Sequence, residues 1–167
     1  MLRDRIHFRM TAFVHETMYG LLRDPYEPLR AAGVEAGLRV LEVGCGPGFF
    51  TVPAAEIVGQ EGRVISLDVS PIAVAHVQEK VTKAGATNIE LLVANAADTG
   101  LPGESFDLVL LFGLGHIVGD VDDVWAELHR VLKPEGVLAV EGRLQPPAAL
   151  YRHVQRLGRV ARFRRVA

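Results

Sequence analysis

The chain has 167 residues, 49% of them hydrophobic, and a formal net charge of −2. This length and apolar content suit one folded domain and exclude an intrinsically disordered chain. The near-neutral charge argues against a protein that coats nucleic acid over its whole surface.

Few features of the sequence bear on location. No apolar run approaches the roughly 18 residues that a membrane-spanning helix needs. Residues 1–5 lack the apolar core of a signal peptide. The single cysteine, Cys45, cannot form an intramolecular disulfide, which fits a reducing compartment. We therefore expect a cytoplasmic protein without a transmembrane segment.

Residues 3–32 are expected to form helices ahead of the first strand. Apolar and aromatic side chains recur there three or four positions apart, which is typical of an amphipathic helix. Asp24-Pro25 breaks the first helix, and a second is predicted over residues 26–32. The apolar stripe indicates either core packing or a helix that covers a ligand site.

One stretch organises the rest, Val40-Leu41-Glu42-Val43-Gly44-Cys45-Gly46-Pro47-Gly48. It reads as a buried strand that turns through three glycines into a helix. Glycine permits positive φ there and lets a ligand approach the main chain. A P-loop is excluded because Phe49-Phe50 stands where Lys-Ser/Thr is needed. A dinucleotide fingerprint is excluded because its small third residue would be Phe49.

The remaining pattern is E-x-G-x-G-x-G, with the acid at Glu42. It resembles the first motif of class I S-adenosylmethionine-dependent methyltransferases, in particular small Rossmann-like domains of the ubiquinone/menaquinone-methyltransferase kind. The resemblance implies that the methionine end of S-adenosylmethionine is held by Glu42, Gly44, Cys45, Gly46 and Gly48.

Asp68 ends the second predicted strand, residues 63–68, 24 positions after Gly44. A carboxylate at that place can accept hydrogen bonds from the two ribose hydroxyls. Asp68 could instead cap the helix predicted over residues 71–83, but Ser70 and Pro71 suit that role better. We take Val69 as part of the same cofactor site.

The third strand, residues 89–93, leads to Asn95 and Ala96. Members of the resembled family commonly have an acid and a small residue at these positions, which contact the adenine. Asn95 departs from that pattern, although its amide can both donate and accept hydrogen bonds. Asp98 is a rival for the role of the acid, and a plain loop is the other interpretation.

The fourth strand, residues 106–112, contains F-D-L-V, which resembles the family's fourth-strand signature. The resemblance implies that Phe112 and Gly113 border the sulfonium. The loop that follows lies where ligands bind in open α/β folds. His116 in this loop is the candidate for orienting the acceptor or taking its proton, although it could equally hydrogen-bond the loop alone. We place the substrate pocket at His15, Tyr19 and Leu114.

A helix over residues 121–132, capped by Asp120, is predicted to lead into a fifth strand at 137–141. Its end, R-V-L-K-P-x-G, resembles a family stretch that joins these two elements. Asp122 and Asp123 could suggest a metal, but the helix N-terminus explains them, and we expect no metal site.

The match thins beyond Gly142. A helix is predicted to start at Pro146-Pro147 and to run to Leu157. Residues 160–166 are predicted to form a sixth strand. The usual seventh strand is then missing, and the uncovered edge suggests a homo-oligomer. Six arginines and no acid occur in residues 150–167. They indicate a solvated face or, less simply, a site for RNA or a membrane surface.

We therefore expect one α/β domain with a doubly wound, mainly parallel sheet of order 3-2-1-4-5 and a sixth strand beyond it. Its parts are a helical cap (1–36), a cofactor-binding core (37–142) and a basic C-terminal segment (143–167). The expected function is methyl transfer from S-adenosylmethionine to a small molecule. The alternatives are a non-catalytic subunit that binds the cofactor and an RNA-directed methyltransferase.

Overall fold

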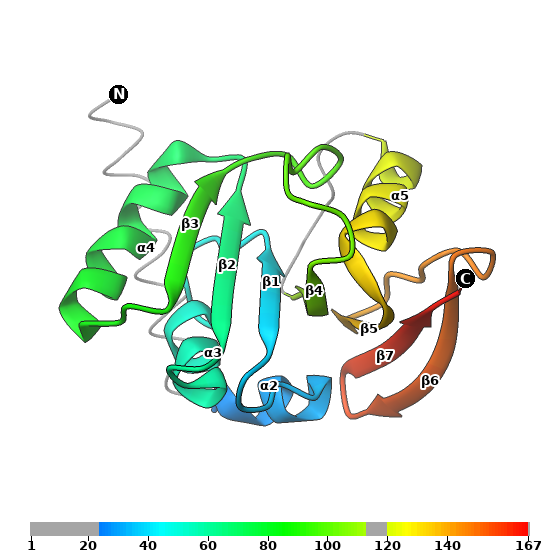
Figure 1. Cartoon of the computed structure of the whole chain (residues 1–167), viewed down its shortest axis with the longest axis horizontal. Coiled ribbons are helices and arrows are strands. Elements are labelled where there is room, and N and C mark those ends of the chain that lie inside the picture. Colours follow the sequence, from blue (N-terminus) through cyan, green and yellow to red (C-terminus); the bar gives the residue numbers. More distant parts are fainter. Residues whose placement is uncertain (1–23, 113–119, 167) are drawn as a thin grey trace.

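The computed structural model describes residues 24–112 and 120–166, which form one sheet with helices on both faces (Figure 1). The elements in chain order are α2 (Tyr26–Ala32), β1 (Arg39–Val43), α3 (Thr51–Val58), β2 (Arg63–Asp68), α4 (Pro71–Ala84), β3 (Ile89–Val93), β4 (Phe106–Leu111), α5 (Val121–Val131), β5 (Leu132–Glu141), β6 (Tyr151–Leu157) and β7 (Val160–Arg165). The strand order is β3-β2-β1-β4-β5-β7-β6. The predicted α/β class and the order 3-2-1-4-5 are confirmed.

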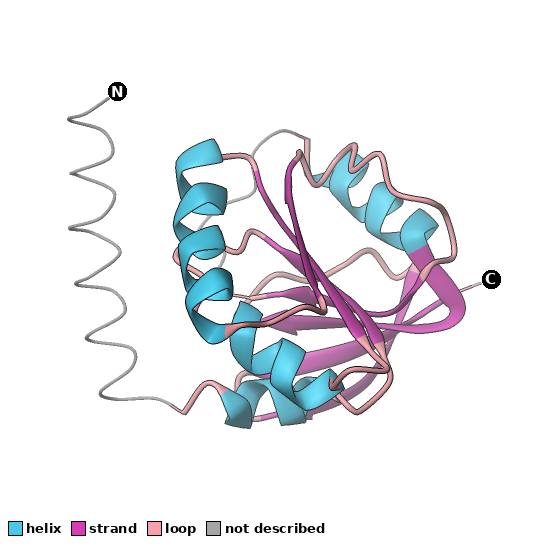
Figure 2. Cartoon of the chain, turned by 60° about the vertical axis from the view of Figure 1, so that its left-hand side comes forward, coloured by secondary structure: helices cyan, strands magenta, loops and turns pink. Residues whose placement is uncertain are grey.

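Strands β1 to β5 are parallel, and β1, β2 and β4 are largely buried on both faces, as the apolar runs in β1 and β4 predict. Strand β3 forms one edge of the sheet and is only partly buried. Helices α2, α3 and α4 cover one face, and α5 covers the other (Figure 2). Leu108 of β4 packs toward Ala54 of α3, whereas its neighbour Val109 packs toward Leu128 of α5. Successive residues of one strand therefore serve two separate apolar cores.

Capping residues in the sequence correctly predicted where α4 and α5 begin. The Ser70 hydroxyl accepts the Ala73 N–H at 3.3 Å, and Pro71 is the first residue of α4. Asp120 accepts the Asp122 N–H at 2.9 Å ahead of α5. Both predicted helices are confirmed. They could be predicted from the sequence because each cap uses only residues next to the helix start.

The fifth strand begins earlier than predicted. Its pairing with β4 starts at Phe106↔Leu132 and resumes at Leu108↔Val137, so residues 133–136 bulge out of the ladder. Pro134 has no N–H to give to a neighbouring strand, and a bulge is where a strand tolerates it.

The prediction for the C-terminal segment is wrong. Residues 151–157 form β6 and not a helix, and the sheet has a seventh strand. The strand predicted at 160–166 exists as β7, which runs antiparallel to both β5 and β6. A helix would have left the outer edge of β7 unpaired, and the hairpin satisfies that edge with backbone hydrogen bonds. In the described part of the chain, no helix is long and apolar enough to cross a bilayer.

Candidate cofactor and acceptor site

The carboxyl ends of the parallel strands meet at one edge of the sheet, and the predicted cofactor residues gather there. Gly44, Gly46 and Gly48 have φ of 73°, 49° and 77°, so all three lie in the left-handed region. The N–H groups of Gly44 and Cys45 donate to the Leu67 carbonyl at 2.8 and 3.0 Å. These two bonds fix the loop on the end of β2.

The glycines at 46 and 48 are needed for different reasons. A Cβ placed on Gly48 would lie 2.7 Å from Cγ2 of Val77 in α4, which is too close. A Cβ on Gly46 would meet no other described atom within 4 Å. The absent side chain at Gly48 therefore lets α4 pack closely, whereas the absent side chain at Gly46 leaves open space beside the main chain.

Asp68 faces the glycine loop with its carboxylate already oriented. One oxygen accepts the Gly46 N–H at 2.9 Å, and the other accepts the Ser70 N–H at 2.8 Å. Each oxygen keeps a second lone pair for a ligand hydroxyl. Val69 follows with 46% of its surface exposed, so an apolar face lies next to the carboxylate. This combination of open glycine backbone, fixed acid and exposed apolar surface fits an adenosyl group.

Glu42 lies beneath the loop rather than on its open side. It is buried, and its Oε2 accepts hydrogen bonds from the hydroxyls of Thr51 and Ser66, both at 2.6 Å. Burial raises the pKa of the Glu42 carboxyl, although the two hydroxyl donors oppose the shift. Its predicted contact with the methionine end of the cofactor stays a prediction.

Cys45 contributes backbone and packing to this site. Its side chain is buried against Val77 and Val81, and burial raises the pKa of the thiol. A thiol that resists ionisation is a poor nucleophile, so we assign it no covalent role.

The loop after β3 carries Asn95 and Ala96 to the same edge. The side-chain oxygen of Asn95 accepts the Ala97 N–H at 3.0 Å, and the backbone carbonyl of Asn95 accepts the Asp98 N–H at 3.0 Å. This tight turn orients the loop, but it also occupies one lone pair of the Asn95 side-chain oxygen, which we predict to contact the adenine. Asn95 and Ala96 as adenine contacts stay a prediction.

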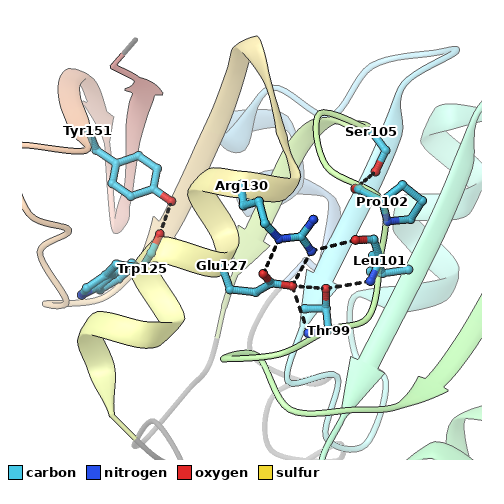
Figure 3. A network of polar contacts seen from close by, with 8 residues as sticks. All are labelled: Thr99, Leu101, Pro102, Ser105, Trp125, Glu127, Arg130 and Tyr151. Atoms are coloured by element: carbon cyan, nitrogen blue, oxygen red, sulfur yellow. Dashed lines mark hydrogen bonds and ion pairs between the residues drawn. The ribbon is translucent and has the colours of Figure 1, made fainter.

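Sequence reasoning missed the ionic network that fixes this loop to α5 (Figure 3). Oε1 of Glu127 accepts the N–H and the hydroxyl of Thr99 at 3.0 and 2.5 Å. Arg130 binds both oxygens of Glu127 at 2.6 and 2.8 Å and donates to the Leu101 carbonyl at 2.7 Å. The Arg130 guanidinium lowers the pKa of Glu127 to about 2. The i,i+3 spacing of Glu127 and Arg130 within one helix could have indicated their ion pair. No spacing indicates the contacts with Thr99 and Leu101, which lie in another segment.

Lys80 is a second residue that the motif search missed. Its ammonium group reaches from α4 to the carbonyls of Pro47 and Gly48, at 3.0 and 3.3 Å. These bonds hold the last turn of the glycine loop against the helix. They also place a positive charge near the buried Glu42.

A pocket of about 310 Å³ lies beside the start of α3. Phe112 at the end of β4 is buried, and its ring meets Phe50 edge-on at 5.2 Å, while Phe50 meets Phe49 at 4.9 Å. The pocket is lined by the two phenylalanines that precede α3, by α2 and the residue Asp24 ahead of it, by the end of β5 and by the β6–β7 turn. Besides Phe49 and Phe50, the lining residues are Asp24, Glu27, Pro28, Ala31, Glu141, Leu157, Gly158, Arg159 and Val160. Its wall is thus largely apolar, with one ion pair between Arg159 and Glu141 at 3.4 Å.

Five of the predicted residues fall outside the described part of the chain. These are the substrate-pocket residues His15, Tyr19 and Leu114, the sulfonium neighbour Gly113 and the catalytic candidate His116. Their roles stay predictions.

Known proteins with similar sequences are methyltransferases. A family model described as a methyltransferase domain matches residues 40–136. A demethylmenaquinone methyltransferase of Listeria monocytogenes is 40% identical over 121 residues, which are 72% of this chain and 51% of that protein. One of Geobacillus stearothermophilus is 38% identical over 119 residues, 71% of this chain and 50% of that protein. The chain thus spans about half the length of these curated relatives.

A solved structure agrees in fold over most of the chain. The crystal structure of an S-adenosylmethionine-dependent methyltransferase from Aquifex aeolicus superposes with a TM-score of 0.75 at 26% identity. The match covers 87% of this chain and 91% of that one.

Proposed function

The chain belongs to the methyltransferase domain family, and on that premise we propose that it transfers a methyl group from S-adenosylmethionine to a quinol of the demethylmenaquinone type. The observation that carries the proposal is the open space over Gly46 beside the oriented Asp68 carboxylate. The names of the relatives supply the acceptor class.

Different residues at this edge of the sheet bind different parts of the cofactor. The Gly44–Gly48 loop holds the methionine end with bare backbone, and Asp68 holds the ribose. Val69 offers an apolar surface to the adenosyl group, and Asn95 with Ala96 borders the adenine. When bound, S-adenosylmethionine supplies a methyl group already activated by its sulfonium.

The protein's contribution is alignment and exclusion of water. Holding a nucleophile in line with an activated carbon can supply roughly 7–11 kcal/mol of the barrier. The pocket beside Phe49 and Phe50 is the place we assign to the acceptor ring, because its wall is mainly apolar. Arg159 and Glu141 give that wall a hydrogen-bond donor and acceptor for ring oxygens.

Calorimetry with S-adenosylmethionine tests the cofactor site. Asp68→Ala should weaken binding by about 1–3 kcal/mol, since a charged hydrogen-bond acceptor is lost. The matched control is Asp107→Ala at the opposite edge of the sheet, where the carboxylate accepts the Arg39 N–H and the Lys133 ammonium at 2.9 and 2.6 Å. The control should leave cofactor affinity unchanged.

Methyl transfer is measured separately, with radiolabelled S-adenosylmethionine and a reduced, short-tailed demethylmenaquinone. Label should appear in the quinone and not in added RNA or protein. If the protein binds the cofactor but no label enters the quinone, RNA or protein, the proposed catalysis is contradicted. The chain would then be a non-catalytic subunit that binds the cofactor. A folded protein that binds neither S-adenosylmethionine nor its demethylated product would contradict the whole assignment.

A further inference from the structure

The strand β6 forms the outer edge of the sheet and is exposed along nearly its whole length (Figure 1). Only Tyr151 is buried, where its hydroxyl donates to the Trp125 carbonyl at 3.0 Å. Val154 and Leu157 expose 48% and 43% of their surface. Among the described residues, β6 pairs with β7 alone, so its other edge faces outward.

This edge carries two exposed positive charges. Three arginines of the hairpin are in ion pairs, namely Arg159 with Glu141, Arg164 with Glu135 and Arg165 with Glu104. Arg152 and Arg156 are exposed and make no ion pair with any described residue. The register sets Arg152 opposite Arg164 and Arg156 opposite Ala161, so the two charges project from opposite faces of the strand.

The charge pattern argues against a second copy of the chain as the occupant of this edge. A second β6 strand paired along this edge would add its own Arg152 and Arg156, and β6 contains no acid to pair with them. Charged side chains on an edge strand disfavour its pairing with another strand. An anionic surface is the complementary partner.

The same hairpin forms a wall of the acceptor pocket. Leu157, Gly158 and Arg159 of its turn line the cavity of about 310 Å³ beside Phe49 and Phe50. The exposed cationic edge and the pocket therefore belong to one structural unit, and a surface that binds this edge would lie beside the pocket.

We propose that the β6 edge and the β6–β7 turn dock on an anionic lipid bilayer, with Arg152 and Arg156 at the headgroups and Val154 and Leu157 against the outer acyl region. Basic side chains near an anionic leaflet gain electrostatic attraction, and small apolar side chains add shallow burial. Docking would bring the pocket to the membrane, where a quinol with an isoprenoid tail resides. This last step rests on the proposed function, whereas the docking itself does not.

Vesicle flotation of the full chain tests the proposal. Vesicles in which half the lipid is phosphatidylglycerol should bind the protein at low salt, and vesicles of phosphatidylcholine alone should not. Each arginine lost should weaken binding about fivefold, so the double variant Arg152→Gln/Arg156→Gln should bind about 25-fold more weakly. The control Arg63→Gln/Lys83→Gln removes the same charge from exposed positions in β2 and α4, and should bind as the wild type does.

The outcomes separate the possible partners. Absence of binding to anionic vesicles, or an equal loss in the control variant, would overturn the proposal. Salt-sensitive binding of a mixed-sequence RNA without vesicle binding would assign the edge to RNA instead. Methylation of a water-soluble, short-tailed acceptor should be the same in the double variant, so failure of docking is distinguishable from failure of the proposed catalysis.

Discussion

The three glycines of the loop all have positive φ, but Gly46 and Gly48 have different surroundings. Gly48 borders the side chain of Val77, and Gly46 borders open space. A substitution to alanine therefore tests packing at one position and ligand access at the other, with similar backbone strain at both.

Gly46→Ala should cost about 1–2 kcal/mol of stability through its positive φ, and should sharply weaken binding of S-adenosylmethionine. Gly48→Ala should cost about 2–4 kcal/mol, since overpacking against Val77 adds to the strain. Chemical denaturation and calorimetry measure the two effects. Full cofactor affinity in Gly46→Ala would show that the space above this residue is not the cofactor's.

Glu42 gives a prediction for stability against pH. Its folded pKa is raised by burial, so its contribution to stability is complete below its ordinary pKa and is lost as pH rises through the raised value. Glu42→Gln can still accept both hydroxyl hydrogen bonds at its one carbonyl oxygen. Urea denaturation across this pH range should show a decline for the wild type that the variant lacks. A parallel decline in both proteins would contradict a raised pKa at Glu42.

At the scale of elements, the connection from β3 to β4 depends on α5. No helix forms between Val93 and Phe106, and the loop there is fixed by the carboxylate of Glu127. Because this loop carries Asn95 and Ala96, the predicted adenine contacts, we expect the network to act on the candidate cofactor site by positioning backbone.

Glu127→Gln should destabilise the protein by about 2 kcal/mol at neutral pH, since charged hydrogen bonds to Thr99 and Arg130 are lost. The folded pKa is about 2, so the wild-type contribution is present above the ordinary pKa of a glutamate and disappears as pH falls toward that value. The two proteins should therefore converge in stability at acid pH. The control Glu135→Gln removes a carboxylate that is 88% exposed and should change stability by less than about 0.5 kcal/mol.

At the scale of the whole molecule, the C-terminal hairpin completes the core. Phe163 and Ala161 of β7 are buried in the cluster that α5 covers, together with Tyr151 of β6. The hairpin also covers the edge of β5, so β6 is the exposed edge strand at this end of the sheet. A homo-oligomer through a sheet edge stays a prediction.

Phe163→Ala should cost about 3–5 kcal/mol, because it leaves a cavity in this cluster. Val154→Ala, at an exposed position on β6, should cost less than about 0.5 kcal/mol. Denaturant unfolding of both variants measures the difference. A small loss in Phe163→Ala would mean that the hairpin is not part of the cooperative core.

Much of the fold could be predicted because its signals are local. The β1 run, the three glycines and the capping residues Ser70 and Asp120 each act within a few positions of the chain. Asp68 followed from strand direction, since parallel strands end at one edge. The start of β5 could not be predicted, because its first residue pairs with β4 across a bulge. The nature of β6 could not be predicted either, because the spacing of Tyr151, Val154 and Leu157 also suits a helix.

The sequence by itself determined the doubly wound core, the glycine turn and the acid at the end of β2, since short-range preferences and apolar runs specify them. Only the tertiary structure decided that residues 151–157 pair as a strand, that Lys80 holds the glycine loop and that Glu127 binds Thr99, 28 positions away. These outcomes depend on backbone and polar groups finding partners across the sheet. A buried group must be satisfied wherever the folded chain brings a partner, and sequence spacing does not encode that partner.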